Sequence, residues 1–155
     1  MWLVGAGASV AAGVPSARQM VDDFKAIIYA TIHKVPLDSI NLGEPGTRSR
    51  VQVFFDTHPG LPSASDPDEY SRAFEAACPS AKDRRNYIES QISKGRPAFG
   101  NMGLAVLAAL ERIRIVWTTN FDRVIEDSAN AIMTLPARLT VAALETSDIA
   151  VQAIA

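Results

Sequence analysis

The chain has 155 residues, of which 48% are hydrophobic, and it carries a formal net charge of −2. These values are typical of a folded globular domain and exclude a disordered chain, and the acidic balance leaves no basic surface for nucleic acid. No apolar run approaches the roughly 20 residues of a transmembrane helix, and the N-terminus lacks the pattern of a secretory signal. We therefore expect one domain in a reducing, cytoplasmic setting.

The cysteine and histidine content bounds the metal chemistry. Cys78 is the only cysteine, so an intrachain disulfide and a multi-cysteine zinc site are both excluded. It lies between Ala77 and Pro79 with no basic neighbour, which favours a packing role over a nucleophile. His33 and His58 have no His or Cys at metal-ligand spacing. No metal site and no zinc are expected.

The N-terminal segment Trp2–Val4 predicts a buried strand that ends in the turn Gly5-Ala6-Gly7-Ala8-Ser9. Glycine at positions 5 and 7 removes the Cβ atoms that would block a tight turn or a close ligand. Backbone amides after such a turn can hold a pyrophosphate. The alternative is a plain strand-to-helix turn that binds nothing.

Helical periodicity dominates the middle of the chain. Apolar residues at i, i+3, i+4 and i+7 spacing predict a helix over 17–33, with Ser16 as its N-cap. Proline, glycine and asparagine mark a loop over 35–47. Further helices are expected over 48–57, from Pro67 near N1 to 77, over 80–92, and over 98–113 with burial on most faces. We expect a helical insertion over approximately 35–97.

Strand patterns return in the last third of the chain. The run Ile113–Trp117 predicts a central strand, followed by the polar turn 118–122 and a helix over 124–132. A third strand is expected over 139–143 and a last helix from residue 146. This alternation predicts an α/β fold with a Rossmann-like parallel sheet. Because residues 149–155 stop inside an apolar helical pattern, we expect a truncated domain, incomplete at its C-terminus, with further domains downstream.

Ligands of open α/β sheets bind at the carboxyl ends of the strands. The turn Thr118-Thr119-Asn120-Phe121-Asp122 follows such an end and carries two hydroxyls, an amide and a carboxylate. Asn120 or Asp122 could instead cap the next helix. Capping requires one such residue, however, so the cluster favours a binding site.

Three segments, taken together, resemble the signatures of the sirtuin-like superfamily. They are Gly5-Ala6-Gly7-Ala8-Ser9, Gly13-Val14-Pro15-Ser16 and Thr118-Thr119-Asn120-Phe121-Asp122, against Gly-Ala-Gly-x-Ser, Gly-Ile-Pro and Thr-x-Asn-x-Asp. The resemblance covers the Rossmann-like frame and leaves out residues 35–95. It is closer to the bacterial branch. Members of that branch often cleave NAD+ as toxic effectors in antiviral (antiphage) defence, fused to other domains.

The resemblance implies a role for each signature residue. The Gly5–Ser9 backbone and the Ser9 hydroxyl would hold the pyrophosphate of NAD+. Asn120 would be catalytic, contacting the nicotinamide ribose and orienting the attacking nucleophile, and Asp122 would bind the nicotinamide amide or hold the loop. The implied NAD+-binding residues are Gly5, Ala6, Gly7, Ala8, Ser9, Gly13, Val14, Pro15, Thr118, Thr119, Asn120 and Asp122.

Two departures shape the expected activity. Protein-deacylating sirtuins carry a four-cysteine zinc module, which this sequence cannot form. The family's catalytic histidine, followed by glycine, has no match, because His33 falls in a helical pattern and His58 precedes Pro59. We expect that histidine downstream. The expected function is the NAD+-binding part of an NAD+ hydrolase; the alternatives are an NAD-dependent protein deacylase and a non-catalytic NAD+ or ADP-ribose module. NAD+ is the expected partner, with no nucleic acid, no membrane and a possible homo-oligomer.

Overall fold

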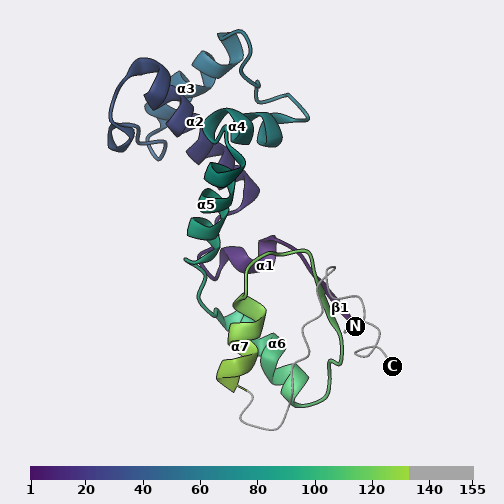
Figure 1. Cartoon of the computed structure of the whole chain (residues 1–155). Helices are drawn as coiled ribbons and strands as arrows, with labels where there is room; N and C mark the ends of the chain where they lie inside the picture. Colours follow the sequence, from purple (N-terminus) through teal and green to yellow (C-terminus); the bar gives the residue numbers. More distant parts are fainter. Residues whose placement is uncertain (133–155) are drawn as a thin grey trace. The chain divides into compact units, whose positions relative to one another are not determined.

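A computed structural model describes residues 1–132 of the chain. The predicted third strand and last helix lie outside the described residues. In chain order the elements are β1 (Trp2–Val4), α1 (Gly7–Val10), α2 (Ala17–His33), the 3-10 helix η1 (Leu37–Ser39), α3 (Pro45–Thr57), α4 (Glu69–Ala77), α5 (Ala81–Ile92), α6 (Phe99–Ala109), β2 (Val116–Thr118) and α7 (Val124–Ile132) (Figure 1). The described part is thus an α/β structure, mostly helical with a small parallel sheet.

The chain divides into two compact units. The first joins Met1–Ala12 to the chain from Gly95 onward, and the second is Gly13–Lys94. The second unit therefore begins before the predicted insertion at about residue 35, because α2 packs on α4. No helix within residues 1–132 is long and apolar enough to span a membrane.

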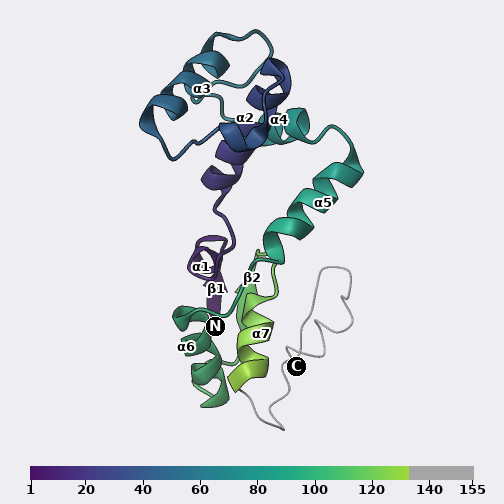
Figure 2. The same cartoon turned by 90° about the vertical axis from the view of Figure 1, so that its left-hand side faces the viewer.

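In the first unit, β1 and β2 form a parallel pair (Figure 2). Leu3 aligns with Trp117 and Val4 with Thr118, and the Thr119 N–H donates to the Val4 carbonyl at 3.2 Å. Helices α6 and α7 pack against each other. Because the strands are parallel, the turns that follow them leave the same edge of the sheet.

Burial in this unit differs from the sequence-based expectation. The prediction of a buried first strand is wrong for Trp2 and Leu3, which are 50% and 78% exposed, while Val4 is buried. The prediction that α6 is buried on most faces is also wrong, since Phe99 is 95% exposed and the buried residues of this helix are Asn101 and Ala105. Apolar composition shows a preference for burial, but the available neighbours decide it.

Three predicted helix boundaries need correction. Helix α3, expected over 48–57, begins at Pro45, inside the predicted loop. Helix α6 ends at Ala109 rather than at 113, because Glu111 takes a positive φ of 56° and the Arg112 N–H returns to the Leu107 carbonyl at 2.9 Å. Helix α4 begins at Glu69, so Pro67 precedes the helix and is not at N1. The segment before α4 is instead a turn in which the Glu69 N–H donates to the Asp66 carbonyl.

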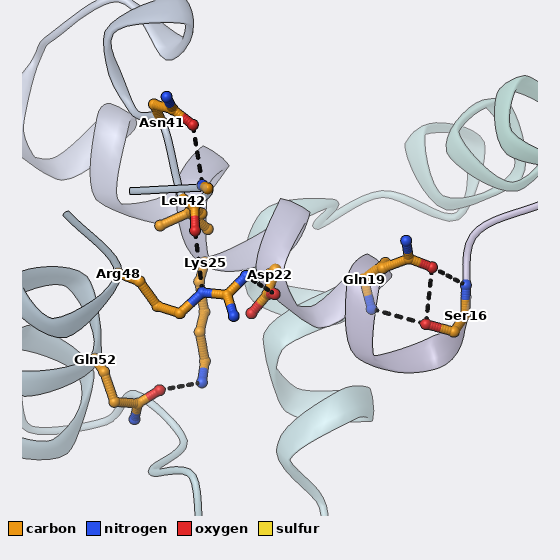
Figure 3. A network of polar contacts seen from close by, with 9 residues as sticks. Ser16, Gln19, Asp22, Lys25, Asn41, Leu42, Arg48 and Gln52 are labelled. Atoms are coloured by element: carbon orange, nitrogen blue, oxygen red, sulfur yellow. Dashed lines mark hydrogen bonds and ion pairs between the residues drawn. The ribbon is translucent and has the colours of Figure 1, made fainter. Parts of the chain in front are cut away.

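The second unit has an aromatic core, and its helix α2 begins with a capping box. Phe24 of α2 is fully buried and stacks on Phe74 of α4 with ring centroids 4.7 Å apart. The predicted N-cap is confirmed: Ser16 Oγ accepts from the Gln19 N–H, and the Gln19 side chain accepts from the Ser16 N–H (Figure 3). Local sequence therefore determines where α2 begins, and aromatic packing holds it.

Candidate functional site

Two of the three signature segments meet in the first unit. The Asn120 Nδ2 group donates to the Gly5 carbonyl at 3.1 Å and to Ser9 Oγ at 2.8 Å. These bonds join the turn after β2 to the turn after β1, across more than 100 residues of sequence. Asn120 is thus the side chain that ties the two strand ends together.

The turn after β2 is ordered by its own side chains. Thr118 Oγ1 accepts from the Asn120 N–H at 3.0 Å, which fixes the backbone that carries Asn120. Asp122 Oδ1 accepts from the Val124 N–H at 3.1 Å at the start of α7. Asp122 therefore satisfies the first backbone N–H of α7, which is part of the helix-capping role that the sequence left open. Thr119 is exposed beside these groups.

The orientation of the Asn120 amide follows from its partners. A carbonyl oxygen only accepts, so the Asn120 atom facing the Gly5 carbonyl must be the NH2 group. Asn120 Oδ1 is then left buried and without a hydrogen-bond partner in the described part of the chain. A buried acceptor without a partner costs about 1–3 kcal/mol. The site thus holds one unsatisfied acceptor that a ligand hydroxyl or a water could use.

The glycines after β1 leave space that the fold does not use. A Cβ built on Gly7 meets no atom of residues 1–132 within 4 Å, and one built on Gly5 meets only Thr119 Oγ1, at an ordinary 3.9 Å. Neither glycine has a positive φ. The turn itself therefore tolerates a side chain at both positions. Open space at an exposed backbone is what close approach of a ligand requires.

The remaining residues of the first signature differ in accessibility. Ala6 is exposed and Ala8 is partly exposed, whereas Ser9 is only 2% exposed. Helix α1 is a single turn, and the Ala8 and Ser9 N–H groups donate to the carbonyls of Gly5 and Ala6. These two amides are already used within the turn, so a ligand would meet the exposed backbone of Gly5–Gly7.

The middle signature, Gly13 to Pro15, belongs to the second unit. Gly13 has a φ of +92°, a conformation that side chains rarely adopt, and a Cβ there would lie 3.5 Å from the Lys94 carbonyl. Val14 is buried and Pro15 is partly buried. Backbone conformation and packing account for Gly13 and Val14 without a ligand.

Sequence reasoning missed one polar residue behind the site. Asn101 of α6 is 3% exposed, its Nδ2 donates to the Ala8 carbonyl at 3.4 Å, and its Oδ1 accepts from the Ala98 N–H at 3.3 Å. It supports the turn after β1 from the side of α6. The available signal was a single asparagine inside an otherwise small and apolar helix.

The other candidate groups are explained by packing. Cys78 is buried, and burial together with the Asp83 carboxylate raises the pKa of its thiol, as expected of a packing residue. His33 and His58 are exposed and their rings lie 5.0 and 4.8 Å from that of Phe54. No cluster of three or more metal-ligating side chains occurs among residues 1–132.

Comparison with known proteins adds no relative. No protein-family model matches the sequence, and no curated protein matches it at a significant level. The assignment of function therefore depends on the signature segments and on the geometry around Asn120.

Proposed function

We propose that this chain is the NAD+-binding part of a sirtuin-like NAD+ hydrolase, which cleaves the nicotinamide–ribose bond. The observation that carries the proposal is the Asn120 side chain, which ties the two strand-end turns together and keeps one buried acceptor without a partner. In this proposal the parallel pair β1–β2 belongs to a Rossmann-like sheet. We further propose that the parent protein is an effector of antiviral defence, as the resemblance implies, and that it acts in the cytoplasm.

The residues present are compatible with a dinucleotide. The exposed backbone of Gly5 to Gly7 has no side chain to keep a pyrophosphate away, and the space at each Cβ position is open or in ordinary contact. Asn120 Oδ1 can accept from a ribose hydroxyl or from a water. Because this oxygen is buried in the ligand-free chain, such a group must displace the atoms that cover it.

The chemistry asks for positioning more than for a strong base. When the nicotinamide–ribose bond breaks, nicotinamide leaves with the electron pair and the ribose gains oxocarbenium character. Water then forms the new bond to the ribose carbon and gives up a proton. An uncharged amide that holds the ribose and the water at fixed distances promotes this step without adding a charge of its own. Asn120 can have this role because both of its N–H groups are anchored to protein.

Calorimetric titration with NAD+ tests the binding half of the proposal. We expect saturable binding, weakened about fivefold to tenfold by Asn120→Ala, since one hydrogen bond to a ligand is worth about 1–1.5 kcal/mol. Asn130→Ala is the matched control, because Asn130 is an exposed asparagine of the same unit. Binding equally strong in Asn120→Ala would contradict the role of Asn120.

Product analysis on the intact protein tests the catalytic half. We expect release of nicotinamide and ADP-ribose from NAD+ alone, and its loss in Asn120→Ala. Release that requires an acylated peptide would indicate a deacylase. Binding without any release would indicate a sensing or oligomerisation module instead.

A further inference from the structure

The buried hydroxyl of Ser9 accepts a hydrogen bond from Asn120, a contact that pyrophosphate binding by Ser9 would not require. Ser9 is 2% exposed, and its Oγ accepts from Asn120 Nδ2 at 2.8 Å, the shorter of the two bonds that this amide makes. The resemblance implies that Ser9 holds the pyrophosphate. The observed contact instead directs the hydroxyl toward the other strand end.

A pyrophosphate is a poor occupant of the space around Ser9. It is large and multiply charged, and taking such a group out of water to reach a buried serine is expensive. The backbone of Gly5 to Gly7 is exposed and offers the same ligand a position that keeps its solvent. The burial of its hydroxyl therefore argues that Ser9 does not contact the phosphates, which the backbone of Gly5–Gly7 would bind instead.

We infer that Ser9 is a positioning residue that acts on the ligand through Asn120. The terminal torsion of an Asn side chain has only a broad preference, so one bond to the Gly5 carbonyl would leave Oδ1 loosely directed. The second bond, to Ser9 Oγ, fixes the plane of the amide, so that Oδ1 is the atom left for a ribose hydroxyl or a water. This inference rests on the proposed function and assigns Ser9 a different contact within it.

The hydrogen bond itself can be tested without any ligand. In a ¹H–¹⁵N spectrum, the Asn120 side-chain signals are identified by their loss in Asn120→Ala. We expect Ser9→Ala to shift them. Ser128→Ala is the matched control: it is also a fully buried serine of the first unit, but its Oγ donates to the Val124 carbonyl at 2.6 Å, and it should leave them in place. Asn120 signals that do not move in Ser9→Ala would overturn the inference.

A double-mutant cycle on NAD+ affinity then tests the route of action. We expect Ser9→Ala to weaken binding about threefold to tenfold in the unaltered chain and by less than about twofold in the Asn120→Ala background. An equal loss in both backgrounds would mean that Ser9 touches the ligand directly, which overturns the inference and leaves the NAD+ site intact. Failure of the unaltered chain to bind NAD+ would instead contradict the proposed function, and the Asn120 signals would still decide whether Ser9 holds the amide.

Discussion

Two pairs of glycines, one in each unit, differ in backbone conformation. In the second unit, Gly13 and Gly60 have φ values of +92° and +90°, which only glycine adopts readily. In the first unit, Gly5 and Gly7 have no positive φ, and a Cβ would meet ordinary contact or open space in the described structure. Backbone conformation therefore explains why Gly13 and Gly60 are glycines. It does not explain Gly5 and Gly7.

Buried polar groups show the same contrast. Lys25 of the second unit is 5% exposed, and its ammonium contacts both Gln52 Oε1 and the Glu69 carboxylate. Asn120 of the first unit has a buried oxygen with no partner among residues 1–132. The Lys25 ammonium is satisfied by protein partners, whereas Asn120 Oδ1 is not. An unsatisfied buried acceptor requires an explanation, and a ligand at Asn120 would provide one. The following predictions test this difference, from the largest effect to the smallest.

Removal of the central aromatic side chain of the second unit should have the largest effect. Phe24 is fully buried among the rings of Tyr70, Phe74 and Tyr87. Phe24→Ala should lower the free energy of unfolding by about 3–5 kcal/mol, measured by urea denaturation. Val53→Ala, at a position that is 60% exposed, should change it by about 0.5 kcal/mol or less. Equal effects would show that this aromatic core does not stabilise the unit.

Alanine at the two kinds of glycine should separate stability from binding. Gly13→Ala should cost about 1–2 kcal/mol of stability because of the positive φ. Gly7→Ala should leave stability unchanged or slightly raised, and should weaken NAD+ binding about tenfold or more by filling the ligand space. Gly103→Ala, an exposed helical glycine with equally open space among the described residues, is the control for both measurements. Normal NAD+ affinity in Gly7→Ala would contradict the proposal that the pyrophosphate lies against the backbone of Gly5–Gly7.

Loss of the N-cap of α2 should have a moderate effect. Ser16 Oγ accepts from the Gln19 N–H, and Ser16→Ala should cost about 1 kcal/mol in urea denaturation. Ser49→Ala is the matched control, since Ser49 is an exposed serine inside α3 and alanine favours a helix. If both substitutions behave alike, the capping box is not formed in solution.

Alkaline pH should weaken the second unit gradually. Burial, and then the Asp23 carboxylate to which Tyr87 Oη donates at 3.1 Å, raises the pKa of Tyr87 above its ordinary value. A raised pKa means that the folded state holds the proton more tightly, so the stabilisation is complete below about pH 10 and is lost as the pH rises further. Urea midpoints should fall above that pH, and less steeply in Tyr87→Phe. Equally steep curves would exclude Tyr87 as a cause.

Local features of this fold were predictable from the sequence. The helix over 17–33 and its Ser16 cap are confirmed, because periodicity and capping depend on neighbouring residues alone. The position of β1 follows in the same way, whereas β2 begins three residues later than the run Ile113–Trp117 predicts and includes Thr118 of the predicted turn. Exposure of Trp2, Leu3 and Phe99 was not predictable, because it depends on which distant elements cover each side chain.

The candidate site was predictable only in part. Parallel strands bring their carboxyl ends to one edge, so the proximity of the turns after β1 and β2 followed from topology. The pairing of Asn120 with Ser9, and the oxygen that it leaves unsatisfied, depend on a side-chain rotation that no sequence pattern encodes. The left-handed conformation of Gly13 and the hydrogen bond from Asn101 to the Ala8 carbonyl were likewise not predictable from the sequence.

An NAD+ titration followed by ¹H–¹⁵N spectra tests the central claim most directly. We predict saturable shifts of the backbone signals of Gly5 and Gly7 and of the side-chain signals of Asn120, while the Gly60 signal stays in place. Unchanged signals after β1 and β2 at saturating NAD+ would contradict the account.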